Sequence, residues 1–201
     1  MMVNFVVLLS FYLLCQCKSS EIQHDINYVY KHTLLMKVLK PPVRLDTTPS
    51  TNAYANMLIK KNKALNGMLI TAVAQTAGKG QDKNFWESKP NENLTISIIV
   101  KPYNLMPARQ FILNKITSLA IRDFVMMHLK DVAVSIKWPN DVYADDQKIA
   151  GILISNTIEG QEITWSVIGI GVNINQTKFE SPAPNPVSLK LLSGANYVLD
   201  D

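Results

Sequence analysis

The sequence predicts an α+β domain in which a mixed, mainly antiparallel sheet is backed by helices. Three observations support this fold class. Most apolar segments are short or alternate with a period of two residues, as strands do, and polar turns join several of them into hairpins. Only two segments have the spacing of clear amphipathic helices. Strands and helices do not alternate along the chain, which excludes a Rossmann arrangement.

The composition fits one ordinary globular domain. The chain has 201 residues, 47% of them hydrophobic and 18% charged, so it can bury a substantial core. Its net charge of +4 comes without a run of like charges, so no nucleic-acid-binding arm is expected. Both cysteines, Cys15 and Cys17, lie near the N-terminus. The rest of the chain therefore has neither a disulfide framework nor a cysteine zinc site.

The N-terminal residues 1–40 form an extension without an assigned role. Val3 to Leu14 is mostly apolar, but a membrane span needs roughly 20 apolar residues. Three interpretations stay open: a signal or lipoprotein leader, a membrane anchor, or a start upstream of the true beginning of the domain. The domain itself is expected to occupy residues 41–201, after the break at Pro41-Pro42.

The first half of the domain should contain three strands and both helices. A helix capped by Ser50, Thr51 or Asn52 should run to about Asn62. A second, long amphipathic helix is predicted from Pro107 to Leu129. The strands are expected at 43–45, 68–74 and 94–100.

The second half of the domain reads as strands joined by tight turns. Residues 132–138 alternate, so that Lys137 lies on the face opposite Val134 and Ile136. Residues 142–144 and 148–155 form a hairpin, and a last strand follows at 163–172.

Three segments carry candidate chemistry. The first is the polar loop 75–93, whose glycines let backbone N–H groups approach an anion and whose Trp86 can close over a ligand. It lacks the Lys-Ser/Thr of a P-loop, and on its own it also fits a flexible loop. The second is Lys137-Trp138-Pro139-Asn140-Asp141, in which Lys137 faces either a cleft or solvent. The third is a set of glycines in apolar strands, which indicates close approach of a ligand or tight strand packing: Gly151, Gly169 and Gly171.

Together, in this order, the motifs resemble the biotin protein ligase family. Lys-Trp-Pro-Asn-Asp at 137–141 is the most specific string, and Ser50-Thr51-Asn52 precedes the first helix as in that family. The loop 75–80 with Trp86 looks like its biotin-binding loop. Residues 148–153 and 169–173 look like the two strands that follow. The resemblance extends over about residues 43–193.

The resemblance implies a fold, a reaction and a set of site residues. The fold is the class II synthetase-like catalytic domain that biotin and lipoate ligases share. The reaction uses ATP and Mg²⁺ to form biotinyl-5′-AMP and transfers biotin to a lysine of a biotin carboxyl carrier protein. Lys137 and Lys79 are the expected catalytic residues. Biotin is expected at Ser50, Thr51, Asn52, Gln75, Gly78, Gly80, Gln81, Lys137 and Gly151, and the nucleotide at Trp86, Asn140, Lys148 and Asn173.

Departures from the family pattern keep alternatives open. The loop reads Gly78-Lys79-Gly80-Gln81 where the family has Gly-Arg-Gly-Arg, and Ser155 replaces a glutamate. The chain is expected to have neither the family's C-terminal β-barrel nor a DNA-binding winged helix. A degenerate biotin-binding protein, or a lipoate or octanoate ligase or transferase, remains an alternative. We expect a cytoplasmic location because the reaction needs ATP, no DNA or membrane partner, no protein-held metal, and either a monomer or a homodimer.

Overall fold

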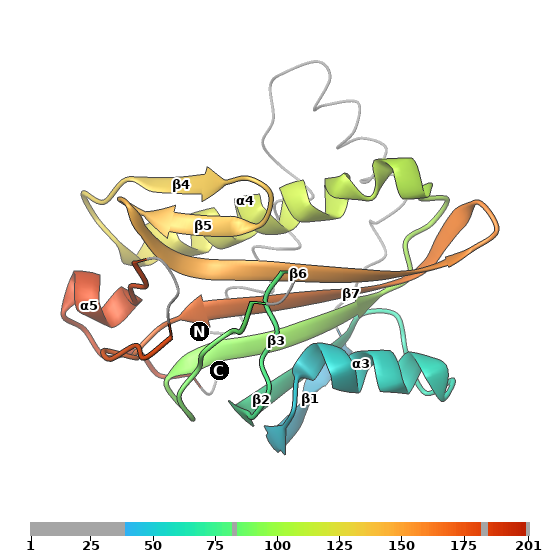
Figure 1. The fold of residues 1–201 in the computed structure, drawn as a ribbon, viewed down its shortest axis with the longest axis horizontal. Helices are drawn as coiled ribbons and strands as arrows, with labels where there is room; N and C mark the ends of the chain where they lie inside the picture. Colours follow the sequence, from blue (N-terminus) through green and yellow to red (C-terminus); the bar gives the residue numbers. More distant parts are fainter. Residues whose placement is uncertain (1–38, 82–83, 182–184, 200–201) are drawn as a thin grey trace.

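The computed structural model describes residues 39–81, 84–181 and 185–199. Its elements are β1 (Leu39–Thr48), α3 (Thr51–Lys60), β2 (Met68–Gln75), β3 (Asn93–Val100), η1 (Pro107–Arg109), α4 (Phe111–His128), β4 (Val134–Lys137), β5 (Asp141–Ala144), β6 (Gln147–Glu159), β7 (Glu162–Asn173) and α5 (Leu189–Ser193). Within this part of the chain, seven strands form one sheet in the order β1-β2-β3-β7-β6-β5-β4 (Figure 1). The apolar run at 3–14 and both cysteines lie outside the described residues.

The sheet is mixed but mainly antiparallel, as the sequence predicts. β1 and β2 run parallel because α3 crosses between them, and each other neighbouring pair among the described strands is antiparallel. β6 and β7 form a long hairpin that turns at Gly160, where φ is +63° and glycine avoids backbone strain. None of the described helices has both the length and the apolar character that a membrane crossing requires.

Alternation along the central strands gives the sheet two different faces. In β3, Ile96 and Ile98 point to one face, where they join the main hydrophobic core. Thr95 and Ser97 point to the other face and are buried there too. β7 pairs with β3, and its Gly169 lies opposite Ser97. One face is therefore apolar, and the other carries hydroxyl groups and glycines.

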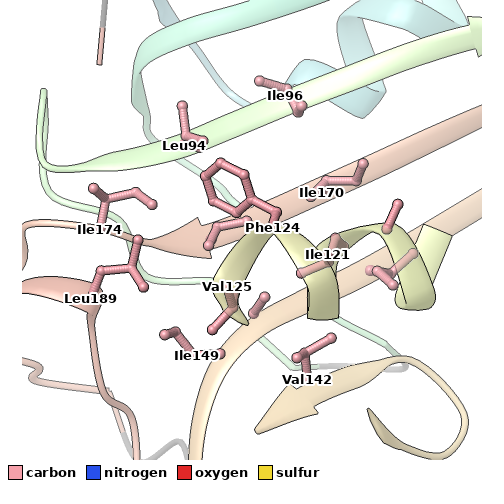
Figure 2. Packing of buried hydrophobic residues seen from close by; sticks show 14 of the residues in the cluster. Leu94, Ile96, Ile121, Phe124, Val125, Val142, Ile149, Ile170, Ile174 and Leu189 are labelled. Atoms are coloured by element: carbon pink, nitrogen blue, oxygen red, sulfur yellow. The ribbon is translucent and has the colours of Figure 1, made fainter. Parts of the chain in front are cut away.

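The apolar face packs against α4. Phe124, Ile121 and Val125 are fully buried on this helix, and they meet Leu94 and Ile170 from the central strands (Figure 2). Their spacing of three and four residues places them on one side of the helix. This contact fixes the central strands β3, β6 and β7 relative to one another.

The opposite face carries α3 at one end. Ala55 of α3 is fully buried and clusters with Ile70, Ile99 and Val167 from three neighbouring strands. This cluster anchors the helix, so its first turn is held over the polar part of the same face.

Several element boundaries differ from the sequence prediction. The strand expected at 43–45 is the ten-residue β1, so Pro41-Pro42 lies inside it and not at a break. The long helix is divided into η1 and α4, and β6 continues beyond residue 155 because it pairs with β7 as far as Glu159. The strand predicted at 132–138 is the four-residue edge strand β4. Its expected buried face ends at Val134, because Ile136 is 38% exposed and Trp138 is 76% exposed.

Candidate active site

A cavity of about 800 Å³ lies on the polar face of the sheet. The start of α3, the loop between β2 and β3, and strands β6 and β7 bound it. Residues from distant parts of the chain meet here because the sheet order places β7 between β3 and β6. The cavity is lined by most residues that the sequence singled out: Ser50, Thr51, Asn52, Gln75, Lys79, Gly80, Gln81, Trp86, Asn140, Lys148, Gly151 and Asn173.

The floor of the cavity consists of paired glycines. Gly151 of β6 lies opposite Gly171 of β7, and the Trp86 indole covers both. A Cβ atom on Gly171 would lie 2.3 Å from Trp86 Cε2, and one on Gly151 would lie 3.0 Å from Trp86 Cζ3. Only glycine therefore admits a flat ring this close to the strands. The buried Nε1 atom of Trp86 has no hydrogen-bond partner within the described residues.

Trp86 reaches the floor because its loop folds back on itself. Trp86 N donates to Gly78 O at 3.0 Å, and Gly80 N donates to Asn84 O at 2.8 Å. A Cβ atom on Gly78 would lie 2.4 Å from Trp86 O, so this position needs a glycine. Gly78 thus closes the loop and does not line the cavity, contrary to the expected contact with biotin.

A polar wall stands at the first turn of α3. Gln75 Oε1 accepts from Thr51 N at 2.8 Å and lies 3.2 Å from Thr51 Oγ1. Since a backbone N–H can only donate, this contact fixes the orientation of the Gln75 amide and makes Nε2, with its two N–H donors, the end of the amide that can bind a ligand. Ser50 occupies the N-cap position, but its side chain makes no capping bond. The wall therefore offers both donors and acceptors to a small polar ligand.

Lys148 places a positive charge beside the Trp86 indole, and Lys79 and Lys89 also line the cavity. Lys148 Nζ lies 2.8 Å from Asp141 Oδ1 and 5.8 Å from the centroid of the Trp86 ring. The Lys148 and Asp141 side chains are only 21% and 20% exposed, so solvent screens the pair less than it would at the surface. Lys148 is therefore placed to hold an anionic group beside the indole.

The position that we predicted for Lys137 is wrong. Its side chain is exposed and does not line the cavity. Lys137 Nζ lies 5.0 Å from the centroid of the Tyr143 ring and 3.5 Å from its hydroxyl oxygen. The reason is the sheet order, because β5 separates the edge strand β4 from β6. Lys148, the lysine that begins the next motif, occupies the place that was expected for Lys137.

Lys79 and Gln81 lie on the exposed part of the loop, at the rim of the cavity. Two asparagines lie at other parts of its wall. Asn140 donates through Nδ2 to Ile152 O at 2.9 Å, and Asn173 donates through Nδ2 to Val187 O at 3.0 Å. The buried Oδ1 atom of Asn173 has no partner in the described part of the chain, so it can accept from a ligand.

A buried amide joins the loop to the segment after β7, and the sequence did not reveal it. Gln176 is fully buried. Its Oε1 accepts from Asn93 Nδ2 at 2.6 Å, and its Nε2 donates to Glu87 Oε1 at 2.7 Å. Glu87 also accepts from the N–H groups of Glu180 and Ser181. Burial raises the pKa of the Glu87 carboxyl, but these hydrogen bonds outweigh it and hold that pKa below the usual value.

The carboxylates of the cavity do not form a metal cage. Among the described residues, no three His, Cys, Asp or Glu side chains lie close enough to hold a metal ion. Asp141 is paired with Lys148, and Glu87 is occupied by N–H donors. These residues do not fit a resident Mg²⁺ site.

Residues 45–173 match the model of the biotin/lipoate A/B protein ligase family. The chain belongs to this family. It is 31% identical over 138 residues to the bifunctional ligase/repressor BirA of Bacillus subtilis, which covers 68% of this chain and 41% of that protein. It is 32% identical over 153 residues to the biotin–[acetyl-CoA-carboxylase] ligase of Paracoccus denitrificans, covering 73% of this chain and 61% of that protein.

Solved structures of the same family share the fold. A biotin protein ligase from Leishmania major in complex with biotinyl-5-AMP aligns with a TM-score of 0.63 and 25% identity, over 78% of this chain and 66% of that one. An Aquifex aeolicus biotin protein ligase in complex with biotin and ATP aligns with a TM-score of 0.64 and 23% identity, over 79% and 63%. This family member therefore spans less than two thirds of the length of these relatives.

Proposed function

We propose that residues 41–201 form the catalytic domain of an ATP-dependent biotin protein ligase. The domain would make biotinyl-5′-AMP and transfer biotin to a lysine of a biotin carboxyl carrier protein. One observation carries this proposal: the donor–acceptor wall at Thr51 and Gln75 and the cation of Lys148 belong to one cavity. Relatives that are named as biotin ligases, and a related structure that holds biotin and ATP, support it.

In the binding step, Ser50, Thr51 and Gln75 hydrogen-bond the ureido group of biotin. The fused bicyclic ring system of biotin would lie on the glycine floor, where a side chain would exclude it. Trp86 occupies that floor in the present structure, so it moves aside when biotin enters and packs beside the adenine. Asn173 Oδ1 faces the nucleotide as an acceptor.

In the activation step, a carboxylate oxygen of biotin attacks the α-phosphorus of ATP, and pyrophosphate leaves with the electrons of the broken P–O bond. Two anionic groups must approach each other, so the site needs positive charge. Lys148 supplies it beside the indole, in the role first expected for Lys137, and Lys79 adds charge from the rim. Mg²⁺ would come as part of the ATP substrate, because the described carboxylates do not form a metal site, and it would neutralise charge on the phosphates.

In the transfer step, the neutral amine of a carrier lysine attacks the acyl carbon of the adenylate. An amide bond forms, AMP leaves, and the amine loses a proton to water. The mixed anhydride hydrolyses readily, so the loop has to cover it until the carrier arrives. Because ATP is a substrate, we place the reaction in the cytoplasm.

The experiment is biotin-dependent exchange of labelled pyrophosphate into ATP, followed by transfer to a carrier protein. Exchange without biotin, or none with it, would disprove adenylate formation. Lipoate is the control substrate for the lipoate branch of the family, and it should not replace biotin.

A second candidate is a protein that binds biotin without completing the reaction, because Lys79 and Gln81 replace the arginines expected on the loop. Calorimetric binding of biotin without pyrophosphate exchange would favour this alternative. If exchange does occur, Gln81→Arg, which restores a charge at the rim, should slow release of the adenylate.

A further inference from the structure

A buried hydroxyl lies directly behind the polar wall. Ser97 of β3 is fully buried and does not line the cavity. Its Oγ lies 2.7 Å from Thr51 Oγ1 and 2.6 Å from Asn52 Oδ1. Both partners belong to the first turn of α3, so Ser97 connects the centre of the sheet to the residues that face the ligand.

The Asn52 amide can have only one orientation. Its Nδ2 donates to Leu153 O at 2.9 Å, and a carbonyl oxygen accepts but never donates. Oδ1 therefore faces Ser97. The amide also fills the space above Gly169, where a Cβ atom would lie 2.3 Å from Oδ1. This packing keeps the amide from rotating.

Counting protons fixes the direction of the remaining bonds. Ser97 has one hydroxyl proton but two oxygen atoms at hydrogen-bond distance. Asn52 Oδ1 has no proton to offer, so Ser97 donates to it. The short contact between Ser97 and Thr51 then requires the proton of Thr51. Thr51 donates to Ser97, and not to Gln75 Oε1, which is farther away at 3.2 Å.

The result is a wall of defined polarity. With its proton directed toward Ser97, Thr51 Oγ1 presents only lone pairs to the cavity. Gln75 Oε1 is held by Thr51 N, so Gln75 presents the N–H donors of Nε2. An acceptor thus stands beside a donor, which is the complement of a ligand that has an N–H next to a carbonyl oxygen. A cyclic urea such as that of biotin has this arrangement.

We propose that Ser97, oriented by Asn52, is a positioning residue that makes Thr51 an obligatory acceptor and thereby selects a ureido N–H. This inference rests on the proposed function, because it concerns how the same site recognises biotin. Ser97 touches no ligand in this scheme and acts only through the Thr51 hydroxyl.

The test is a double-mutant cycle on the full chain, with biotin affinity measured by calorimetry. Ser97→Ala should weaken biotin binding roughly three- to tenfold, the usual size of one neutral hydrogen bond. Thr51→Val should weaken it at least as much. The double variant should bind about as weakly as Thr51→Val alone, because Ser97 has no other route to the ligand. The proposal would be overturned if the affinity losses of the two single variants multiplied in the double variant. It would also be overturned if Ser97→Ala bound biotin with unchanged affinity.

Ser166→Ala is the matched control. Ser166 is equally buried, on β7, and its Oγ bonds to Asn156 Oδ1 at 2.7 Å, but it does not line the cavity or contact Thr51. It should lose similar thermal stability and keep wild-type biotin affinity. Should Ser97→Ala fail to fold, Asn52→Ala tests the same series of hydrogen bonds, because Asn52 accepts the Ser97 proton. A folded Asn52→Ala protein with unchanged biotin affinity would also contradict the proposal.

A comparison of two ligands distinguishes a change in the direction of the Thr51 hydroxyl from a general disturbance of the binding site. Wild-type protein should prefer biotin to an analogue in which the ring N–H facing Thr51 is replaced by oxygen. Ser97→Ala should reduce this preference, because its Thr51 hydroxyl can rotate and donate. Equal weakening of both ligands would indicate a structural role only and would refute the proposal. If the wild-type protein binds no biotin, the proposed function fails with it; if it binds biotin while Ser97→Ala behaves as wild type, only this inference fails.

Discussion

Replacing Lys148 with methionine tests whether Lys148 supplies the positive charge that the anionic substrates need. Methionine keeps most of the length of the lysine side chain and removes its charge. The variant loses the cation at 2.8 Å from Asp141 Oδ1 and leaves that carboxylate unpaired at the cavity wall. Two effects then oppose binding of the anionic substrates, the lost attraction and the new repulsion.

The size of the effect follows from the partial burial of the pair. The Lys148 and Asp141 side chains are 21% and 20% exposed, so an effective dielectric constant of about 20 is appropriate. At that value, a unit charge acts on an anion about 4 Å away with about 4 kcal/mol. Losing this interaction in the transition state corresponds to a decrease of roughly a thousandfold in kcat/KM.

The assay is biotin-dependent pyrophosphate exchange, with Lys137→Met as the matched control. Lys137 is exposed beside Tyr143 and does not line the cavity, so its replacement should leave exchange within about twofold of wild type. Melting temperatures of both variants show whether the fold is intact. Equal losses in the two variants, or a larger loss in Lys137→Met, would refute the assignment of Lys148.

Three further outcomes are expected. Gly171→Ala should place a methyl group on the floor where the biotin rings are proposed to lie, and the new Cβ would lie 2.3 Å from the present position of the Trp86 ring; biotin affinity should fall at least tenfold while the melting temperature changes little. The melting temperature of Glu87→Gln should be below that of wild type at neutral pH. This difference should shrink as the pH falls below 4.5, because the carboxylate that holds the hydrogen bonds becomes protonated as the pH passes its lowered pKa. Phe124→Ala should lose about 3–5 kcal/mol of unfolding free energy in urea denaturation, since the ring is fully buried between α4 and the sheet.

Local pattern was sufficient to predict most of the fold. The alternation of Leu94 to Val100 and the turn at Gly160 both correspond to elements of the structure. The predicted ends of strands were less accurate where the length of a strand depends on the neighbouring strand with which it pairs. β6 extends to Glu159 because β7 offers partners that far, and its own sequence does not reveal this.

The structure brings residues of the Ser-Thr-Asn, glycine-loop and Lys-Ile-Ala-Gly motifs into one cavity, whereas the position of Lys137 depends on the sheet order. Alternation placed Lys137 on the correct strand, but not at the outer edge of the sheet, two strands from the glycine floor. Ser97 and Gln176 were missed for a similar reason. Their key partners lie 46 and 83 residues away, so no local pattern indicates that they support the site.

The position of Trp86 provides an internal optical reporter. The chain has three tryptophans, and only Trp86 among them lines the cavity. Trp138 is 76% exposed, and Trp165 lies elsewhere with Lys101 Nζ 5.5 Å from its ring. In a protein with phenylalanine at positions 138 and 165, the remaining emission would arise from the indole on the glycine floor. Its wavelength and quenching by iodide would follow ligand entry in real time, without any attached dye.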